Sequence, residues 1–186
     1  MPTDVQAQLP PVFSLKISLG DGDRPIEGDF ALEAGDRKRV AAFLRIESLE
    51  SVALDYRLTP AAKNRFRLSG QLRAELTQLC GVTLDPVAES IDEPVDLECW
   101  PEKQIAATVA EEDVLVSDLP EDPPAPIVNG AVDLGALAIE LLASAINPYP
   151  RKSGAALEWE DEKTRDADGT NKLGPFAGLS KLKPKE

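Results

Sequence analysis

The stretch Arg65-Phe-Arg-Leu-Ser-Gly-Gln-Leu-Arg-Ala-Glu-Leu-Thr77 alternates polar and apolar residues over thirteen positions. Successive side chains of a β-strand point to opposite faces, so this pattern predicts one long strand with a buried and a solvated face. Such half-solvated strands are typical of antiparallel sheets. Gly70 falls on the apolar side, where we expect a bend or a close backbone approach. Leu79 is out of phase with Leu76, which indicates a bulge or twist near Gln78.

The segments around this strand predict the rest of the sheet. Residues 12–19 and 52–58 alternate in the same way, and residues 26–30 fit a short strand less clearly. Residues 60–63 interrupt the pattern before Arg65. After a turn at Asp85-Pro86, residues 87–99 predict a return strand, in which Pro94 indicates a sheet edge or a bulge.

Two segments have helical spacing. In residues 36–46 we expect Asp36 as the N-cap, with Val40, Phe43 and Leu44 on the buried side. In residues 133–146 Asp133 is the predicted N-cap, and Pro148 and Pro150 stop the chain from continuing as helix. The apolar stripe of this second helix comprises Leu134, Leu137, Leu141, Leu142 and Ala145.

These elements predict a single α+β domain over residues 11–150. We expect a curved or barrel-like antiparallel sheet of about four to six strands, packed with two helices. Residues 1–10 predict a flexible start. Residues 102–130 are acidic and rich in proline, which predicts a long loop with a short extended piece at 114–116. Residues 151–186 predict a mostly disordered tail.

Composition excludes several classes of protein. The chain has 186 residues and no histidine, which removes the commonest general base and every Ser-His-Asp or Cys-His arrangement. Its two cysteines, Cys80 and Cys99, form no Cys-x-x-Cys pair, and we expect two half-buried strand cysteines without a metal. No glycine-rich phosphate loop and no membrane span is present. We therefore expect a cytoplasmic, non-enzymatic protein without cofactor or small-molecule substrate.

Charge limits the choice of partner. The net charge is −13, and residues 101–146 alone carry nine acidic residues and one basic residue. An acidic chain repels phosphate on average, so RNA binding would require a local basic patch. The alternative is an indirect role through a basic protein.

Three blocks of sequence follow one another along the chain: Cys80, Thr83, Leu84, Pro86 and Val87 in the first, Asp133, Leu134, Gly135, Glu140, Pro148, Tyr149 and Pro150 in the second, and Pro175, Phe176, Ala177, Leu179, Leu182 and Lys183 in the third. In these blocks the chain resembles the bacterial YceD-like family of large ribosomal RNA subunit accumulation proteins. The resemblance covers about residues 10–183. Many members share the Cys-x-x-Thr-Leu-x-Pro-Val form of the first block, whereas others carry a second cysteine where this chain has Thr83, so a metal role for such a pair does not carry over. Gly174 stands where the family has asparagine.

The resemblance implies a non-enzymatic role in synthesis, processing or accumulation of large-subunit ribosomal RNA. The implied partners are a precursor of that RNA or a basic ribosomal protein. One rival interpretation is a protein-interaction adaptor without RNA contact. A less favoured rival is a metal-dependent hydrolase, because its carboxylates would lie in a proline-rich loop that is poorly suited to hold ligands. Those carboxylates belong to Glu111, Glu112, Asp113, Asp118, Glu121 and Asp122.

The first candidate site is a row of arginines. Arg65, Arg67 and Arg73 share one parity of the long strand, and Arg57 lies on a neighbouring strand, so all four can project from one sheet face. Arginine binds phosphate through its planar fork of donors. The alternative is an ordinary solvated face, in which the arginines pair with acids such as Asp55 and Glu75.

The remaining candidates follow the second helix. Tyr149, beside Arg151 and Lys152, could stack on a base or pack over the helix end. Glu140 could contact a partner from the helix surface. The terminal segment could fold on a partner as a short linear motif or stay disordered, and its candidate residues are Phe176, Leu179, Lys181 and Lys183.

Overall fold

The computed structural model describes residues 11–20, 24–110 and 123–156. The chain divides into two compact units, Met1–Ala155 and Ala156–Glu186, and the helices and strands named below belong to the first unit. Several predictions lie outside the described residues. They concern the flexible start at 1–10, the extended piece at 114–116, the acidic cluster at 111–122 and the terminal motif at 175–183.

The described residues form seven strands, three α-helices and one short 3-10 turn. The helices are α1 (Ala34–Leu44), α2 (Glu102–Ala110) and α3 (Leu134–Ala145), and the 3-10 turn is Ala62–Asn64. The strands are β1 (Lys16–Ser18), β2 (Ile26–Ala31), β3 (Ser48–Ala61), β4 (Arg65–Leu79), β5 (Pro86–Pro101), β6 (Ala125–Val128) and β7 (Ala131–Asp133).

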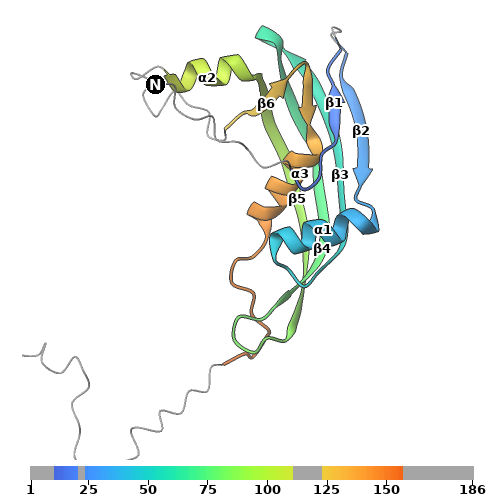
Figure 1. Ribbon diagram of the computed structural model, residues 1–186, viewed down its shortest axis with the longest axis vertical. Coiled ribbons are helices and arrows are strands. Elements are labelled where there is room, and N and C mark those ends of the chain that lie inside the picture. Colours follow the sequence, from blue (N-terminus) through green and yellow to red (C-terminus); the bar gives the residue numbers. More distant parts are fainter. Residues whose placement is uncertain (1–10, 21–23, 111–122, 157–186) are drawn as a thin grey trace, which may run out of the picture. The chain divides into compact units, whose positions relative to one another are not determined.

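All seven strands belong to one curled sheet with the order β1-β7-β6-β5-β4-β3-β2 (Figure 1). Neighbouring strands run antiparallel except β5 and β6, which are parallel. The α+β class is confirmed, but the prediction of four to six antiparallel strands is wrong in number, and the sheet is mixed. The sequence pattern missed β6 and β7 because strands of four and three residues are too short to show a period.

The long strand is confirmed, since β4 spans Arg65–Leu79 and pairs with β3 on one side and β5 on the other. Gly70 lies where a Cβ would overlap the backbone carbonyl oxygen of Asp55, so the expected close approach is present. The predicted irregularity near Gln78 is misplaced. The register shift lies on β3, between Leu49 and Ser51.

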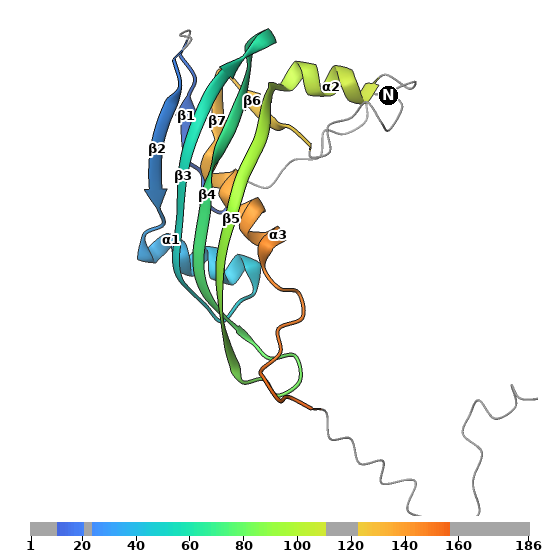
Figure 2. The same cartoon turned by 180° about the vertical axis from the view of Figure 1, so that it is seen from behind.

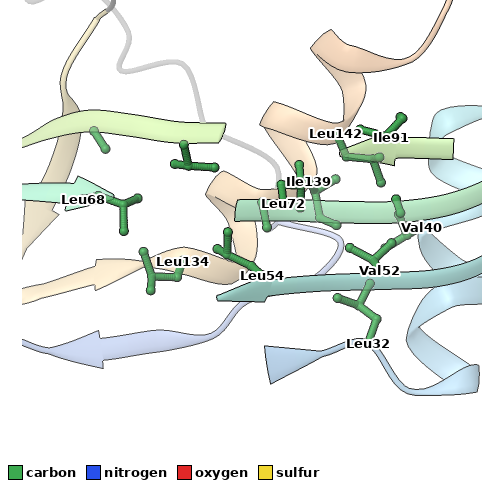
Figure 3. Packing of buried hydrophobic residues seen from close by; sticks show 14 of the residues in the cluster. Leu32, Val40, Val52, Leu54, Leu68, Leu72, Ile91, Leu134, Ile139 and Leu142 are labelled. Atoms are coloured by element: carbon green, nitrogen blue, oxygen red, sulfur yellow. The ribbon is translucent and has the colours of Figure 1, made fainter. Parts of the chain in front are cut away.

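The core lies between one face of the sheet and the helices α1 and α3 (Figure 3). Buried side chains of β3, β4 and β5 alternate with exposed ones, as period-two strands require. The helices close this face from the inner side of the curl. Its fully buried large side chains include Val40, Val52, Leu54, Leu68, Leu72, Leu134 and Leu142.

Helix α3 is confirmed with its N-cap, because the Asp133 carboxylate accepts a hydrogen bond of 3.0 Å from the backbone N–H of Ala136. Helix α1 differs from the prediction at both ends. Its N-cap is Glu33, while Asp36 lies in the first turn and pairs with Arg39. Phe43 was expected to be buried but is 64% exposed.

The prediction of a continuous loop over 102–130 is wrong. Glu102–Ala110 forms α2 directly after β5, and Ala125–Val128 forms β6. An acidic residue in the first turn and three alanines favour the helix locally. Acid and proline content over the whole stretch concealed that signal. At the other end, only Lys16–Ser18 of the expected strand 12–19 is paired, and β3 continues through Pro60 to Ala61.

Candidate partner-binding surfaces

The four arginines share the outer face of the sheet, as their parity predicted. Arg57 pairs in register with Ser69, and Arg67 and Arg73 follow on β4 at even spacing from it. Arg65 begins the same strand with the same parity. This face points away from the core helices, so its side chains meet solvent. Whether these arginines bind RNA stays a prediction.

Three of these arginines are engaged by carboxylates of neighbouring strands. Arg67 donates two hydrogen bonds to Asp96, of 2.7 Å from Nε and 2.5 Å from Nη2. Asp96 thereby raises the pKa of Arg67, and Arg67 lowers the pKa of Asp96. Arg73 reaches Asp55 at 2.9 Å and Asp92 at 3.4 Å.

The third pair joins Arg57 and Glu27 at 2.9 Å. All these side chains remain at least half exposed. Exposed pairs of this kind typically stabilise a fold by less than about 1 kcal/mol. The main consequence of these pairs is therefore electrostatic, because a nearby carboxylate offsets the positive charge of each of the three arginines.

Arg65 has a different environment. Its guanidinium carbon lies 3.4 Å from the ring centroid of Trp100, and its Nε donates to Gln104 Oε1 at 2.9 Å. The Gln104 amide in turn donates to the backbone oxygen of Lys63 at 2.9 Å. Arg65 thus ties the ends of β4 and β5 to α2. Trp100 and Gln104 are distant from Arg65 in the chain, so the sequence pattern could not reveal this contact.

The outer face is acidic overall. The register of β2 to β5 places seven carboxylates on it against the four arginines. A positive stripe is therefore absent from this described part of the sheet. The carboxylates are Glu27, Asp29, Asp55, Glu75, Asp92, Asp96 and Glu98.

The turn between β4 and β5 packs against the segment that follows α3. The N–H of Gly81 donates to the Pro150 carbonyl at 2.9 Å, and Lys152 Nζ lies 3.0 Å from Asp85. Further up, the Gln78 amide donates to the Asn147 carbonyl at 3.1 Å. The structure therefore joins the first two sequence blocks of the family resemblance at one site, the hairpin tip (residues 78–86 with 147–152).

Cys80 lies at the centre of the hairpin tip. Its Sγ accepts from the backbone N–H groups of Lys152 at 3.4 Å and of Val82 and Thr83 at 3.5 Å. These hydrogen bonds, led by that of Lys152, together with one from the Thr83 side chain, lower the pKa of Cys80 to about 6. The side chain is fully buried but stands apart from the core cluster, since the tip itself encloses it.

The pKa of Cys99 is shifted in the opposite direction from that of Cys80. Cys99 is fully buried within the core cluster, and this burial raises its pKa to about 12. The prediction of two half-buried cysteines is therefore wrong for both residues. Within the described residues, no cluster of three or more cysteine or carboxylate groups could hold a metal ion.

Two large side chains project from the hairpin tip. Tyr149 is 80% exposed, so it does not pack over the end of α3, and the neighbouring Arg151 is exposed as well. Leu84 is 70% exposed, and its backbone has a φ of 60°, which lies in the left-handed region. Strained conformations of this kind tend to gather at functional sites.

The second sequence block also contains Asp133, Gly135 and Glu140. Asp133 bonds the N-terminal segment as well as α3, through Ser14 Oγ at 2.5 Å and Leu15 N–H at 3.0 Å. A Cβ on Gly135 would overlap the backbone of Leu15, so this position requires glycine. Exposed Glu140 lines an apolar groove of about 610 Å³, together with Phe13, Phe43 and Leu137.

These surfaces belong to an α+β protein with one curled mixed sheet, whose outer face and hairpin tip are exposed to solvent. Comparison with protein families matches residues 68–183 to the family described as large ribosomal RNA subunit accumulation protein YceD. The match covers more than half of the chain, and the chain belongs to this family. No curated protein and no solved structure matches it.

The matched range begins inside β4 and includes the hairpin tip and α3. The description of the family connects the chain with ribosome biogenesis and with accumulation of large-subunit ribosomal RNA. None of the helices among the described residues has the length and hydrophobicity that a membrane-spanning segment requires. The terminal candidates Phe176, Leu179, Lys181 and Lys183 fall within the match but outside the described residues.

Proposed function

We propose that this protein supports accumulation of large-subunit ribosomal RNA by binding a basic ribosomal protein, without catalysing a reaction. One observation supports this choice over RNA. Arg57, Arg67 and Arg73 already pair with carboxylates, and acids outnumber arginines on their face. A phosphate would have to displace those carboxylates and approach a negative surface, which the general repulsion of anions opposes.

A lysine- and arginine-rich protein fits this surface better. Opposite charge on two partners raises the rate of encounter and disfavours wrong partners, even where single surface pairs add little affinity. A basic ribosomal protein that is shielded by an acidic partner until it joins the particle would link this chain to the amount of ribosomal RNA that accumulates.

The test is sedimentation of a lysate from the native host, with the full chain tagged, before and after ribonuclease treatment. We expect a complex with a basic ribosomal protein that survives digestion. A complex that collapses on digestion would indicate RNA as the direct partner. Recovery only at the top of the gradient, with no associated protein, would contradict stable binding of either kind.

A second candidate is RNA contact at the hairpin tip. The observation in its favour is the 80% exposed ring of Tyr149 next to Arg151, because exposed aromatic rings stack on unpaired bases. Ultraviolet crosslinking of the full chain in cells tests it. RNA crosslinks that fall in Tyr149→Ala and persist in Tyr56→Phe, a change on the inner face of β3, would support this candidate.

A further inference from the structure

The strand β5 has an open edge along most of its length. It pairs with β4 from Pro86 to Cys99, but with β6 only from Cys99 to Pro101. Figure 2 shows β6 meeting β5 near one end, beside α2. Within the described part of the chain, no hydrogen bond between backbone groups reaches residues 87–98 from the side opposite β4, although the Asn147 N–H donates to the Glu89 carboxylate at 3.1 Å. An unpaired edge of this kind is a template for a further strand.

The register identifies which backbone groups face this edge. The Cys80 N–H donates to the Asp85 carbonyl at 2.8 Å, and hydrogen-bonded and non-hydrogen-bonded pairs alternate along an antiparallel ladder from there. Odd-numbered residues of β5 therefore bond β4, and even-numbered residues face outward. The Thr77 carbonyl oxygen supports this assignment. It accepts a hydrogen bond from the Glu47 N–H and therefore points away from Ala88, its partner on β5.

The prolines of the strand fit the same assignment. Pro86 and Pro94 are even-numbered, so neither removes a hydrogen bond to β4, and Pro101 lies beyond Cys99, where the pairing with β4 ends. The outward donors are then the N–H groups of Ala88, Ser90, Asp92, Asp96 and Glu98. The prediction that Pro94 marks an edge or a bulge is confirmed for the edge.

The side chains along this edge define what can bind there. Residues 86–98 include five carboxylates and no basic residue. Asp92, Asp96 and Glu98 lie on the outer face. The inner face carries buried Ile91 and Val95 and half-buried Leu97, with Glu89 and Glu93 beside them. An added strand would therefore meet acids on one of its faces and mainly apolar side chains, with two carboxylates among them, on the other.

We propose that an extended protein segment that alternates lysine or arginine with apolar residues adds to the edge of β5 as a further strand. This inference rests on the proposed binding of a basic protein and names its site. Backbone hydrogen bonds would supply affinity, and the alternating side chains would supply specificity. A second copy of this chain fits poorly, because two β5 edges would bring like charges together.

The probe is a synthetic peptide of about twelve residues that alternates lysine and valine, a length that matches one strand edge. It is added to the full chain labelled with nitrogen-15. We expect hydrogen exchange at the N–H groups of Ser90, Asp92 and Asp96 to slow by at least about tenfold at saturation. The N–H groups of Ile91 and Val95, which already bond β4, should change little.

A matched peptide separates strand addition from charge attraction. It has the same sequence with every backbone nitrogen methylated, which keeps every charge but removes the donors on both edges. This peptide should bind at least about tenfold more weakly. Equal binding of both peptides, or protection that appears only at the arginines of the outer face, would overturn the proposal.

A protein variant gives a second test. Ser90→Pro removes one outward N–H donor without removing a backbone bond to β4. Ser90→Ala keeps that donor and serves as the control, because both variants lose the hydrogen bond from the Ser90 hydroxyl to Glu75. We expect Ser90→Pro to weaken peptide binding by about tenfold and Ser90→Ala by less than about twofold. If Ser90→Pro fails to fold, the two peptides still decide the question on the unaltered chain.

Failure of this inference and failure of the proposed function can be distinguished. If the chain retains a ribonuclease-resistant basic partner while the peptide leaves β5 unprotected, the edge proposal falls and the proposed function stands. If the peptide protects β5 but the lysate yields no basic partner, the proposed function falls and the edge proposal stands. Protection of these N–H groups that rises with concentration of the chain alone would make a second copy the occupant and overturn the proposal.

Discussion

At the scale of single residues, the two cysteines show how local hydrogen bonding can outweigh burial. Both side chains are shielded from solvent, yet the pKa of Cys80 falls to about 6 and that of Cys99 rises to about 12. The difference comes from three backbone N–H groups and the Thr83 side chain, which bond the Cys80 sulfur, whereas burial alone acts on Cys99. Backbone donors stabilise a thiolate in the way they stabilise any bound anion.

This difference predicts a pH-dependent stability. A thiol with a folded pKa of about 6 and an ordinary value of 9.0 stabilises the fold fully above pH 9, and this contribution is lost as pH falls toward 6. Urea unfolding between pH 6 and 8.5 should therefore show a free energy of unfolding that rises with pH. Cys80→Ala should remove most of this rise.

Cys99→Ala is the matched control. Its thiol stays protonated over the same range, so the substitution should lower stability by about 1–2 kcal/mol at every pH and keep the slope. An unchanged slope in Cys80→Ala would show that the tip does not hold a thiolate.

Gly70 permits a second prediction. A Cβ at this position would overlap the Asp55 carbonyl on β3, so Gly70→Ala must push the central strands apart. We expect a loss of about 3 kcal/mol in the free energy of unfolding, as for an overpacked core. Gly35→Ala in α1, where nothing lies within 4 Å, should change it by less than about 1 kcal/mol. Similar small changes in both variants would contradict the close approach.

Local patterns predicted some residue roles and not others. The shared face of the arginines, the Asp133 cap and the tight fit at Gly70 each follow from a period or a neighbour in sequence. The Cys80 cluster does not, because Lys152 lies 72 residues away from it in the chain. The ion pairs of Arg67 and Arg73 depend on the register of β4 against its neighbours, which no single strand specifies.

At the scale of elements, α3 is anchored by one carboxylate. Asp133 accepts from Ala136 within the helix and from Ser14 and Leu15 in the N-terminal segment. Burial raises the pKa of Asp133, but these hydrogen bonds outweigh it and leave the pKa lowered. The same residue therefore caps the helix and holds β1 beside β7.

Asp133→Ala should lower the free energy of unfolding by about 2 kcal/mol at pH 7, the upper range for loss of an N-cap. Because the folded pKa is lowered, the contribution of the carboxylate is present above its ordinary value and lost as pH falls through the folded value. The difference between the two proteins should thus narrow in acid. Denaturation at pH 7 and pH 3 measures it, and a constant difference would contradict the role of the charge.

Elements with long, clear periods were predicted well, and short ones were not. Thirteen alternating residues were enough for β4, and a capped apolar stripe was enough for α3. Helix α2 and strands β6 and β7 lie in or beside the acidic, proline-rich segment 102–130. The composition of this segment obscures the helical or strand pattern of such short elements. Their pairing is set by tertiary contacts, such as the parallel contact of β6 with β5.

At the scale of the whole molecule, the pairing of the strands determines where charges gather on the surface, and their order along the sequence does not. Along the sequence, the acidic excess is concentrated in residues 101–146. The register instead gathers carboxylates from β2, β3, β4 and β5 onto one outer face, where arginines mask part of them. This masking sets how strongly the face attracts a basic partner.

Removal of the masking arginines therefore distinguishes a basic protein from RNA as partner. Combined Arg57→Gln, Arg67→Gln and Arg73→Gln should leave the fold intact, because exposed ion pairs contribute little. It should increase the amount of basic ribosomal protein recovered with the tagged chain by several-fold, since four carboxylate groups lose their counter-charges. Higher salt should reduce that gain.

The matched control changes the same number of charges elsewhere. Arg24→Gln, Lys38→Gln and Arg39→Gln combine exposed positions outside the outer face of the sheet, and recovery should stay near that of the unaltered chain. If only total charge mattered, both triple variants would gain equally. If the arginine row contacted RNA, the outer-face variant would lose its ribonuclease-sensitive association while the control kept it. Reduced recovery in the outer-face variant alone would therefore reverse the assignment of the partner.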